Sequence, residues 1–181
     1  MKFKNIIYYS LYSIFGKHLP ISYHIGGKLA MKVRYLLLNK YVAQCGKNVN
    51  FEKNCQLNST LKIGDNSSVG VNAIIGDYVT IGEDVMMGPN CIIYTRNHKH
   101  EISDIPFVEQ GYEDFKPVFI DDNVWIGEGV KIMPGTKINK NTVVAAGAVV
   151  TKEFPPNCII GGNPARVLKE LKWYNLNICE L

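Results

Sequence analysis

The chain has 181 residues and a formal net charge of +4; 46% of its residues are hydrophobic and 20% are charged. This length suits one domain with a buried core, the composition excludes disorder, and no apolar run approaches the roughly 18 residues of a membrane-spanning helix, which excludes an integral membrane protein. The five cysteines form no CxxC pair, so a disulfide framework and a Cys-rich zinc site are disfavoured and a cytoplasmic protein is expected.

The N-terminal segment of the chain is much more basic than the rest. Residues 1–51 hold eight Lys or Arg and no acid, whereas residues 52–181 hold twelve Lys or Arg against sixteen Asp or Glu. Such a segment can meet nucleic acid, an anionic membrane surface or a partner, or it can be a solvated face. Its beginning lacks the small-residue cleavage site of a secretory signal, so a signal peptide is not expected.

Two amphipathic helices are expected in this basic segment. Apolar side chains recur every three or four positions in each, and Gly16 and Pro20 end the first helix. The first apolar stripe comprises Phe3, Ile6, Ile7, Leu11, Ile14 and Phe15, and the second comprises Leu29, Val33, Leu36, Leu37 and Tyr41. We expect residues 1–44 to form a helical cap over the domain that follows. The alternative is a peripheral membrane contact at the inner face of the membrane, because lysines beside tyrosines suit a lipid headgroup region.

A hydrophobic residue recurs at every sixth position after this segment. One series comprises Cys45, Phe51, Leu57, Ile63, Val69, Ile75, Ile81, Met87 and Ile93, and a second comprises Ile120, Ile126, Ile132, Ile138, Val144 and Val150. Ile93 and Ile120 are 27 positions apart, which is not a multiple of six, so a loop leaves the repeats over residues 99–117. A long loop on a regular scaffold is usually functional or disordered, and we expect this one to be functional.

The residues between these positions exclude both a helix and a simple strand. Residues two and three after each hydrophobic position are mostly polar, although a strand or a helix would bury many of them. The residues four positions after each hydrophobic position are mostly small or β-branched. Gly, Asn and Asp fill the corners, where a positive φ is needed. Three short strands and three corners make a coil of eighteen residues, and stacked coils bury the hydrophobic column.

Three stretches carry a family resemblance: IGDYVTIGEDVMMGPN, VFIDDNVWIGEGVKIMPGTKI and NTVVAAGAVVTKEFPPNCIIGGNPARVLKE. Over roughly residues 45–170 the chain resembles the hexapeptide-repeat acyltransferases, and most of all the sugar and capsular-polysaccharide O-acetyltransferases. The resemblance implies a left-handed parallel β-helix over residues 45–160 and a C-terminal tail or helix over residues 161–181. It also implies a homotrimer with sites between neighbouring subunits.

His98, in the segment TRNHKH at the mouth of the loop, is the candidate catalytic residue. A neutral imidazole can take the proton of a hydroxyl that attacks an acyl carbon. The family's catalytic histidine stands eight residues after a Pro-Asn pair like Pro89-Asn90, so the resemblance assigns the general-base role to His98; His100 is the alternative. Asn97, a loop carboxylate or a backbone carbonyl could each orient the ring. The expected acceptor-binding residues are Asn90, Asn97 and Tyr112.

The resemblance also points to residues that would hold acetyl-CoA. Trp125 would pack on the thioester arm, and backbone N–H groups around Gly127 and Glu128 would form an oxyanion site. The family often has a small residue where Glu128 stands, so only a backbone contact is carried over there. The remaining coenzyme residues implied are Ala146, Thr151, Lys152, Arg166 and Lys169, whose cations would pair with phosphate.

The sequence therefore predicts acetyl transfer from acetyl-CoA to a sugar hydroxyl, in the biosynthesis of capsule, exopolysaccharide or O-antigen, without a metal and without nucleic acid. A streptogramin- or chloramphenicol-type xenobiotic acetyltransferase and a nucleotide-sugar N-acetyltransferase are the nearest alternatives. A zinc-dependent γ-type carbonic anhydrase would need three histidines, and only His98 and His100 lie in the repeats. A non-catalytic β-helix subunit that serves assembly alone is a further alternative.

Overall fold

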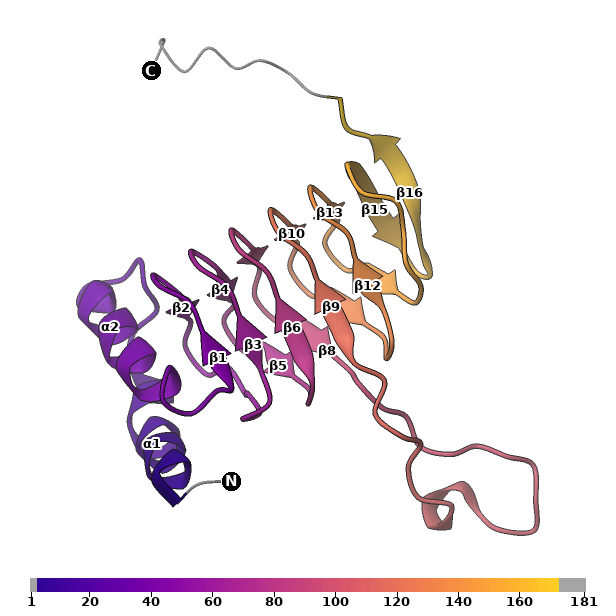
Figure 1. Ribbon diagram of the computed structural model, residues 1–181, viewed down its shortest axis with the longest axis horizontal. Helices are drawn as coiled ribbons and strands as arrows, with labels where there is room; N and C mark the ends of the chain where they lie inside the picture. Colours follow the sequence, from indigo (N-terminus) through magenta and orange to yellow (C-terminus); the bar gives the residue numbers. More distant parts are fainter. Residues whose placement is uncertain (1–2, 173–181) are drawn as a thin grey trace.

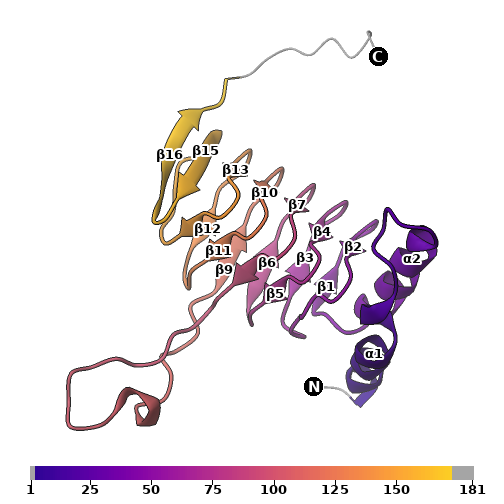
Figure 2. The ribbon, with the colours of Figure 1, turned by 180° about the vertical axis from the view of Figure 1, so that it is seen from behind.

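The computed structural model describes residues 3–172, with side chains from Ile6 onward, as a three-sided prism of stacked, mostly parallel strands with helices at one end (Figure 1 and Figure 2). The first face holds β1 (Gln44–Cys45), β3 (Lys62–Ile63), β6 (Val79–Ile81), β9 (Val118–Ile120) and β12 (Lys137–Ile138). The second face holds β2 (Asn50–Phe51), β4 (Ser68–Val69), β7 (Met86–Met87), β10 (Trp125–Ile126), β13 (Val143–Val144), β15 (Cys158–Gly162) and β16 (Ala165–Glu170). The third face holds β5 (Ile74–Ile75), β8 (Ile92–Ile93), β11 (Lys131–Ile132) and β14 (Val149–Val150).

The strand register confirms the eighteen-residue coil. Gln44 pairs with Lys62, and Lys62 pairs with Thr80, each one coil later. Thr80 then pairs with Phe119, 39 residues later, because the chain leaves the prism between β8 and β9. The long loop, which includes the short helix η2 (Phe107–Glu109), projects from the side of the prism (Figure 1).

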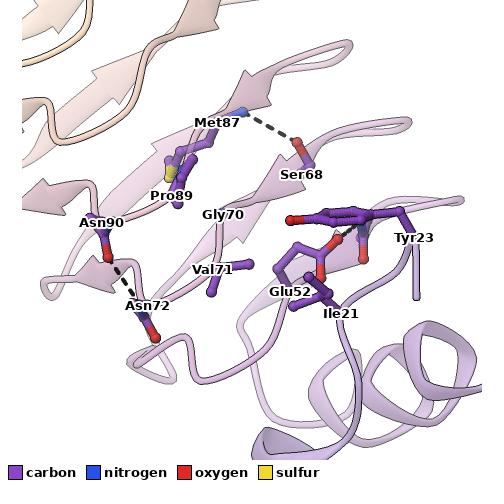
Figure 3. Close-up of a pocket in the computed structure, with 11 residues that line it drawn as sticks. Ile21, Tyr23, Glu52, Ser68, Gly70, Val71, Asn72, Met87, Pro89 and Asn90 are labelled. Atoms are coloured by element: carbon purple, nitrogen blue, oxygen red, sulfur yellow. Dashed lines mark hydrogen bonds between the residues drawn. The ribbon is translucent and has the colours of Figure 1, made fainter. Parts of the chain in front are cut away.

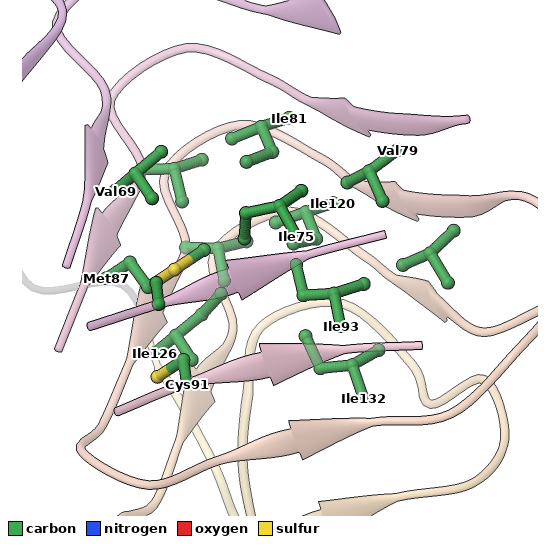
Figure 4. Packing of buried hydrophobic residues seen from close by; sticks show 14 of the residues in the cluster. Val69, Ile75, Val79, Ile81, Met87, Cys91, Ile93, Ile120, Ile126 and Ile132 are labelled. Carbon is green, nitrogen blue, oxygen red and sulfur yellow. The ribbon is translucent and has the colours of Figure 1, made fainter. Parts of the chain in front are cut away.

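The hydrophobic column fills the interior of the prism, as the six-residue period predicts. Fourteen of its fifteen positions are buried and Cys45 is half-buried. Figure 4 shows Ile75, Ile93 and Ile132 following one another along the column, and these three side chains belong to adjacent strands of the third face. Each such side chain contributes about 1.5–3 kcal/mol through burial. Burial also raises the pKa of the Cys55 thiol to about 11, so this thiol stays neutral in the core.

Asparagine ladders hold the corners of successive coils together. The backbone has positive φ at Asn48, Asn54, Asn66, Asn72, Asn90, Asn123, Asn141 and Asn157, as expected for residues that fill sharp corners. Their amides also bond from coil to coil: Asn54 Nδ2 donates to Asn72 Oδ1 at 3.0 Å, and Asn72 Nδ2 donates to Asn90 Oδ1 at 3.0 Å. The corner residues therefore satisfy both the turn geometry and the stacking.

Helices α1 (Phe3–Ile14) and α2 (Gly27–Leu38), joined through the short helix η1 (Gly16–His18), cover the open end of the first coil. The Tyr12 hydroxyl donates to the Cys55 carbonyl at 2.7 Å. The Arg34 guanidinium is fully buried and donates to the carbonyls of Phe51 and Pro20. The bonds to Cys55 and Phe51 satisfy carbonyl oxygens of the first coil, which have no further coil to pair with.

Most side chains of the two apolar stripes are exposed. Leu11, Ile14, Leu29 and Leu36 are 41–68% exposed, whereas Tyr12 on the opposite side of α1 is 1% exposed. The reason is the hydrogen bonding at the end of the prism. Only side chains with N–H or O–H donors can pair with the open carbonyls, so each helix turns its polar-tipped side inward.

The expected C-terminal helix is replaced by a strand in the part that the structure describes. β16 runs antiparallel to β15, with Gly162 opposite Ala165. β15 would otherwise be an open edge, and the hairpin supplies it with hydrogen-bond partners. Residues 173–181, which include Cys179, lie outside the described residues. No helix in the described part of the chain is both long and apolar enough to cross a membrane.

Candidate active site

His98 lies at the base of the projecting loop, where the two ends of the loop pair. The Lys99 amide donates to Gly111 O at 3.0 Å, and the Glu113 amide donates to Asn97 O at 2.9 Å. These bonds place His98 directly opposite Tyr112 in an antiparallel bridge. The sequence therefore positions His98 through the few backbone bonds that close the loop.

Aromatic stacking holds the His98 ring. Its centroid lies 4.0 Å from that of Tyr112, with 34° between the ring planes. The Arg96 guanidinium lies 4.1 Å from the Tyr112 ring centroid and 4.6 Å from that of Phe115, so a cation supports the same stack. His98 itself is solvent-exposed, which leaves it open to a substrate. The Asn97 carbonyl, one of the groups expected to orient the ring, accepts from the Glu113 amide instead, and the contact given for the ring is its stack on Tyr112.

The alternative base, His100, has a different environment. Its Nδ1 lies 3.3 Å from the His98 carbonyl oxygen. It lines a hollow of about 370 Å³ together with charged loop residues, among them Glu113 and Lys116. The ion pair between these two, 2.8 Å long, holds the pKa of the Glu113 carboxyl below its ordinary value. The structure therefore separates the two histidines, with His98 in the aromatic stack and His100 among charges.

Trp125 lies on the outer side of the second face and is 53% exposed. In the register of that face it stands between Met86 and Val143, and Val143 in turn stands beside Ile159. These four side chains form an apolar stripe that leads along the face to β15. An exposed indole within such a stripe is free to contact a ligand or a second chain.

The expected oxyanion site around Gly127 needs a correction. The Gly127 N–H donates to Val144 O at 2.8 Å, so this amide is committed to the β-helix and cannot bind an acyl oxygen. A Cβ at Gly127 would lie 2.6 Å from the Ala146 nitrogen, so glycine is needed because two coils approach closely there. Within residues 3–172, the amides of Glu128 and Ala146 enter no such backbone bond. These two amides, on adjacent coils of one edge, are the available donors.

Asn90 and Glu128 belong to the ladder on the same edge. The Asn90 Nδ2 donates to Glu128 Oε1 at 3.2 Å, and Asn90 Oδ1 accepts from Asn72. The Glu128 carboxylate therefore ends an asparagine ladder, which explains an acidic side chain at a position where the family often has a small one. Asn90, expected to bind the acceptor, has its amide engaged in this stacking.

Thr151, Lys152 and Arg166, expected at the coenzyme end, share one groove. It has a volume of about 630 Å³ and lies between the segment after β14 and the β15–β16 hairpin. Lys169, three residues beyond Arg166 on β16, is exposed but does not line the groove. The Lys152 ammonium lies 5.6 Å from the Phe154 ring centroid, and Phe154 closes the end of the core. Two cations and a hydroxyl in one groove can bind phosphate groups.

A second pocket, of about 360 Å³, lies between the chain at Ile21 and Tyr23 and the edge between the second and third faces (Figure 3). Its lining combines polar side chains, among them Asn50, Glu52 and Ser68, with apolar ones. Asn90, one of the expected acceptor-binding residues, also lines this pocket, whereas Asn50, Glu52 and Ser68 were not expected from the sequence. Their only signal was that Glu52 is the first acid after a long basic segment, and nothing in the sequence shows that residues 19–25 fold over it.

The Glu52 carboxylate anchors the wall of this pocket. It accepts hydrogen bonds from the Ser22 amide and hydroxyl and from Asn50 Nδ2, and it lies 3.4 Å from the buried Arg34 guanidinium. Burial alone would raise the pKa of Glu52, but these bonds from Ser22 and Asn50 and the charge of Arg34 lower it overall. Asn50 Oδ1 is buried and has no hydrogen-bond partner among the described residues.

The expected site residues do not meet within one chain. His98 follows β8, at the edge between the third and first faces, whereas Glu128, Ala146 and the pocket lie at the edge between the second and third faces. The whole third face separates these two edges. A single chain therefore presents the expected site residues in two separate groups.

Comparisons with known proteins agree with this architecture. A family profile described as bacterial transferase hexapeptide (six repeats) matches residues 117–152, and one described as hexapeptide repeat of succinyl-transferase matches residues 60–76. A galactoside O-acetyltransferase from Lactococcus lactis is 36% identical over 126 residues, which are 70% of this chain and 55% of that protein. The chain spans about half the length of the curated relatives it matches.

Two solved structures are similar over nearly the whole chain. The crystal structure of a maltose O-acetyltransferase from Clostridium difficile 630 is 34% identical with a TM-score of 0.77, covering 94% of this chain and 87% of that one. A hexapeptide-repeat acetyltransferase from Vibrio cholerae, complexed with acetyl coenzyme A, is 29% identical with a TM-score of 0.75, covering 94% and 88%. These similarities confirm the left-handed β-helix.

Proposed function

Since the chain belongs to the hexapeptide-repeat acyltransferase family, we propose that it transfers an acetyl group from acetyl-CoA to a sugar hydroxyl. The observation that carries this proposal is the similarity to a maltose O-acetyltransferase over 94% of the chain. The acetyl coenzyme A bound to the similar Vibrio cholerae protein supports the choice of acyl donor.

In the proposed reaction, His98 takes the proton of the acceptor hydroxyl while the hydroxyl oxygen attacks the thioester carbon. The new C–O bond forms, the C–S bond breaks, and the departing thiolate takes the proton from the imidazolium. The amides of Glu128 and Ala146 are the proposed donors to the acyl oxygen and the amide-rich coenzyme arm. The stack of His98 on Tyr112 supports this role, because it fixes the ring while leaving its edge exposed.

The proposed coenzyme path follows the second face. Its phosphate end would lie in the groove of Thr151, Lys152 and Arg166. Its arm would run along the apolar stripe at Trp125, which is two strands from β15, or roughly 10 Å. Lys169 would assist from outside the groove.

The pocket beside Glu52 is the proposed acceptor site. Its volume, about 360 Å³, lies in the range of small-ligand pockets. The Glu52 carboxylate can accept from a sugar hydroxyl, and apolar neighbours such as Met87 and Pro89 can contact the face of a sugar ring. Asn97 and Tyr112 would act from the His98 side.

We further propose a homotrimer in which His98 of one subunit completes the site on the next. The separation of the two groups of site residues in one chain supports this arrangement. So do the exposed apolar side chains of the loop, where Ile102 is 95% and Val108 is 83% exposed, since large exposed apolar groups are typical of interfaces.

The proposed biological role is acetylation of a surface polysaccharide or its precursor on the cytoplasmic side, where acetyl-CoA is available. The test is an assay of thiol release from acetyl-CoA with sugars, nucleotide sugars, amino sugars and chloramphenicol as acceptors. The proposal predicts turnover with hydroxyl sugars and a product that mild base hydrolyses, as it does esters. Faster acetylation of amines or of chloramphenicol, or no turnover with any sugar, would contradict it.

A further inference from the structure

Helix α1 has an apolar side that nothing in the described part of the chain covers. Ile7, Leu11 and Ile14 follow one another at spacings of four and three, so they lie on one side of the helix. They are 46%, 41% and 62% exposed. The opposite side carries Tyr12, which bonds to the first coil of the prism. The exposed side of α1 therefore faces away from the prism.

Helix α2 repeats this arrangement with lysines added. Its inner side buries Ala30, Arg34 and Leu38. Its outer side exposes Leu29 by 68% and Leu36 by 62%. The lysines at positions 28, 32 and 40 are exposed at the same end. The segment between the two helices adds Ile25, which is fully exposed, and Tyr23, which is 78% exposed. We call these outward sides of α1 and α2, with the segment between them, the end surface.

The charge of the end surface has one sign. Residues 1–51 contain no acid, and Arg34 is neutralised by the buried Glu52, so the exposed charges that remain at this end are lysines. The rest of the chain carries a net negative charge. An anionic plane would therefore attract this end of the molecule.

We propose that the end surface binds an anionic lipid bilayer. Apolar side chains flanked by lysines on a helix are the pattern of helices that lie in the plane of a membrane interface. The groove of Thr151 and Arg166 is at the opposite end of the prism and would stay in water, whereas the pocket lined by Ile21 and Tyr23 would lie next to the lipid (Figure 1). The binding itself does not depend on the proposed acetyl transfer.

Flotation with vesicles tests the proposal directly. The full-length protein should float with phosphatidylglycerol-containing vesicles and at least tenfold less with pure phosphatidylcholine. The triple variant Ile7→Ser, Leu11→Ser, Ile14→Ser should lose at least tenfold in binding. The matched control Ile74→Ser, Phe119→Ser, Leu168→Ser removes three apolar side chains of similar exposure, 39–62%, from the prism and should bind like the wild type.

A second set of variants tests the charge. Replacing Lys28, Lys32 and Lys40 by Gln should weaken binding to anionic vesicles about fivefold per lysine. Replacing the exposed Lys62, Lys131 and Lys140 of the prism should change it little. Equal binding by all variants, or no binding to anionic vesicles by the wild type, would overturn the proposal. The proposal would also be overturned if the α1 variant bound vesicles like the wild type but had a lower mass by light scattering. That result would mean that a second copy of the chain covers the exposed side of α1.

Discussion

The environment of His98 combines exposure with a fixed ring. The loop closes on itself through main-chain bonds around Asn97 and Gly111, and Tyr112 stacks against the imidazole at 4.0 Å. A residue held in this way can meet a substrate without losing rotamer freedom at the moment of binding. An exposed imidazole held in this way suits the proposed role of general base.

Removal of this base is the first prediction at the level of single residues. His98→Ala should lower kcat for sugar acetylation by about 10²–10⁴-fold, because proton removal from the hydroxyl is lost. His100→Ala, a change of the same kind two residues away, should stay within about threefold of the wild type. Steady-state kinetics with saturating acetyl-CoA make the comparison. A His98→Ala protein with wild-type kcat would contradict the mechanism.

Tyr112 is expected to act as a positioning residue for His98. Tyr112→Ala should lower kcat about tenfold, since a stacked pair contributes about 0.5–1.5 kcal/mol. Tyr112→Phe keeps the ring and should retain nearly full kcat. If only the hydroxyl mattered, Phe would be as damaging as Ala, and kinetics of the two variants distinguish these outcomes.

At the level of elements, the attachment of the helices depends on one buried cation. Arg34 joins α2 to Phe51, Pro20 and Glu52. Arg34→Met should reduce the free energy of unfolding by about 3–5 kcal/mol, because it leaves the Glu52 carboxylate buried without its counter-charge. The neighbouring exposed Lys32→Met should change it by less than about 0.5 kcal/mol. Urea denaturation measures both, and similar losses in the two variants would refute the assignment.

The secondary-structure elements also show which parts of the fold could be predicted from the sequence. The six-residue period identified the prism because each repeat buries one aliphatic residue, whatever the rest of the chain does. The same kind of pattern located α1 and α2 but did not show which side faces the prism, because that side is set by the bonds of Tyr12 to Cys55 and of Arg34 to Phe51. The strand β16 was missed because the open edge of β15 that it covers exists only in the folded molecule.

The candidate site was predictable to a similar extent. Thr151, Lys152 and Arg166 were expected together and share a groove. The pocket at Asn50 and Glu52 was not expected, because it exists only where residues 19–25 fold over the first coils. The Gly127 amide was misassigned because sequence does not show which N–H groups the ladder uses.

At the level of the whole molecule, the three-sided cross-section places chemistry on different edges. His98 lies at the edge between the third and first faces. Trp125 lies on the second face, and Glu128 and the proposed acceptor pocket lie at the edge between the second and third faces. In a cyclic trimer, each of the three equivalent interfaces brings an edge of one copy against a face of the next. In the proposed homotrimer, each site therefore takes His98 from one subunit and the coenzyme surface from its neighbour.

Subunit complementation tests this claim most directly. His98→Ala and Trp125→Ala proteins should each be nearly inactive when expressed alone. Co-expressed in equal amounts, they should recover about a quarter of wild-type activity, because about one interface in four pairs an intact His98 with an intact Trp125. Mixed oligomers with no more activity than the parents would show that His98 and Trp125 must belong to the same chain, and would contradict the account.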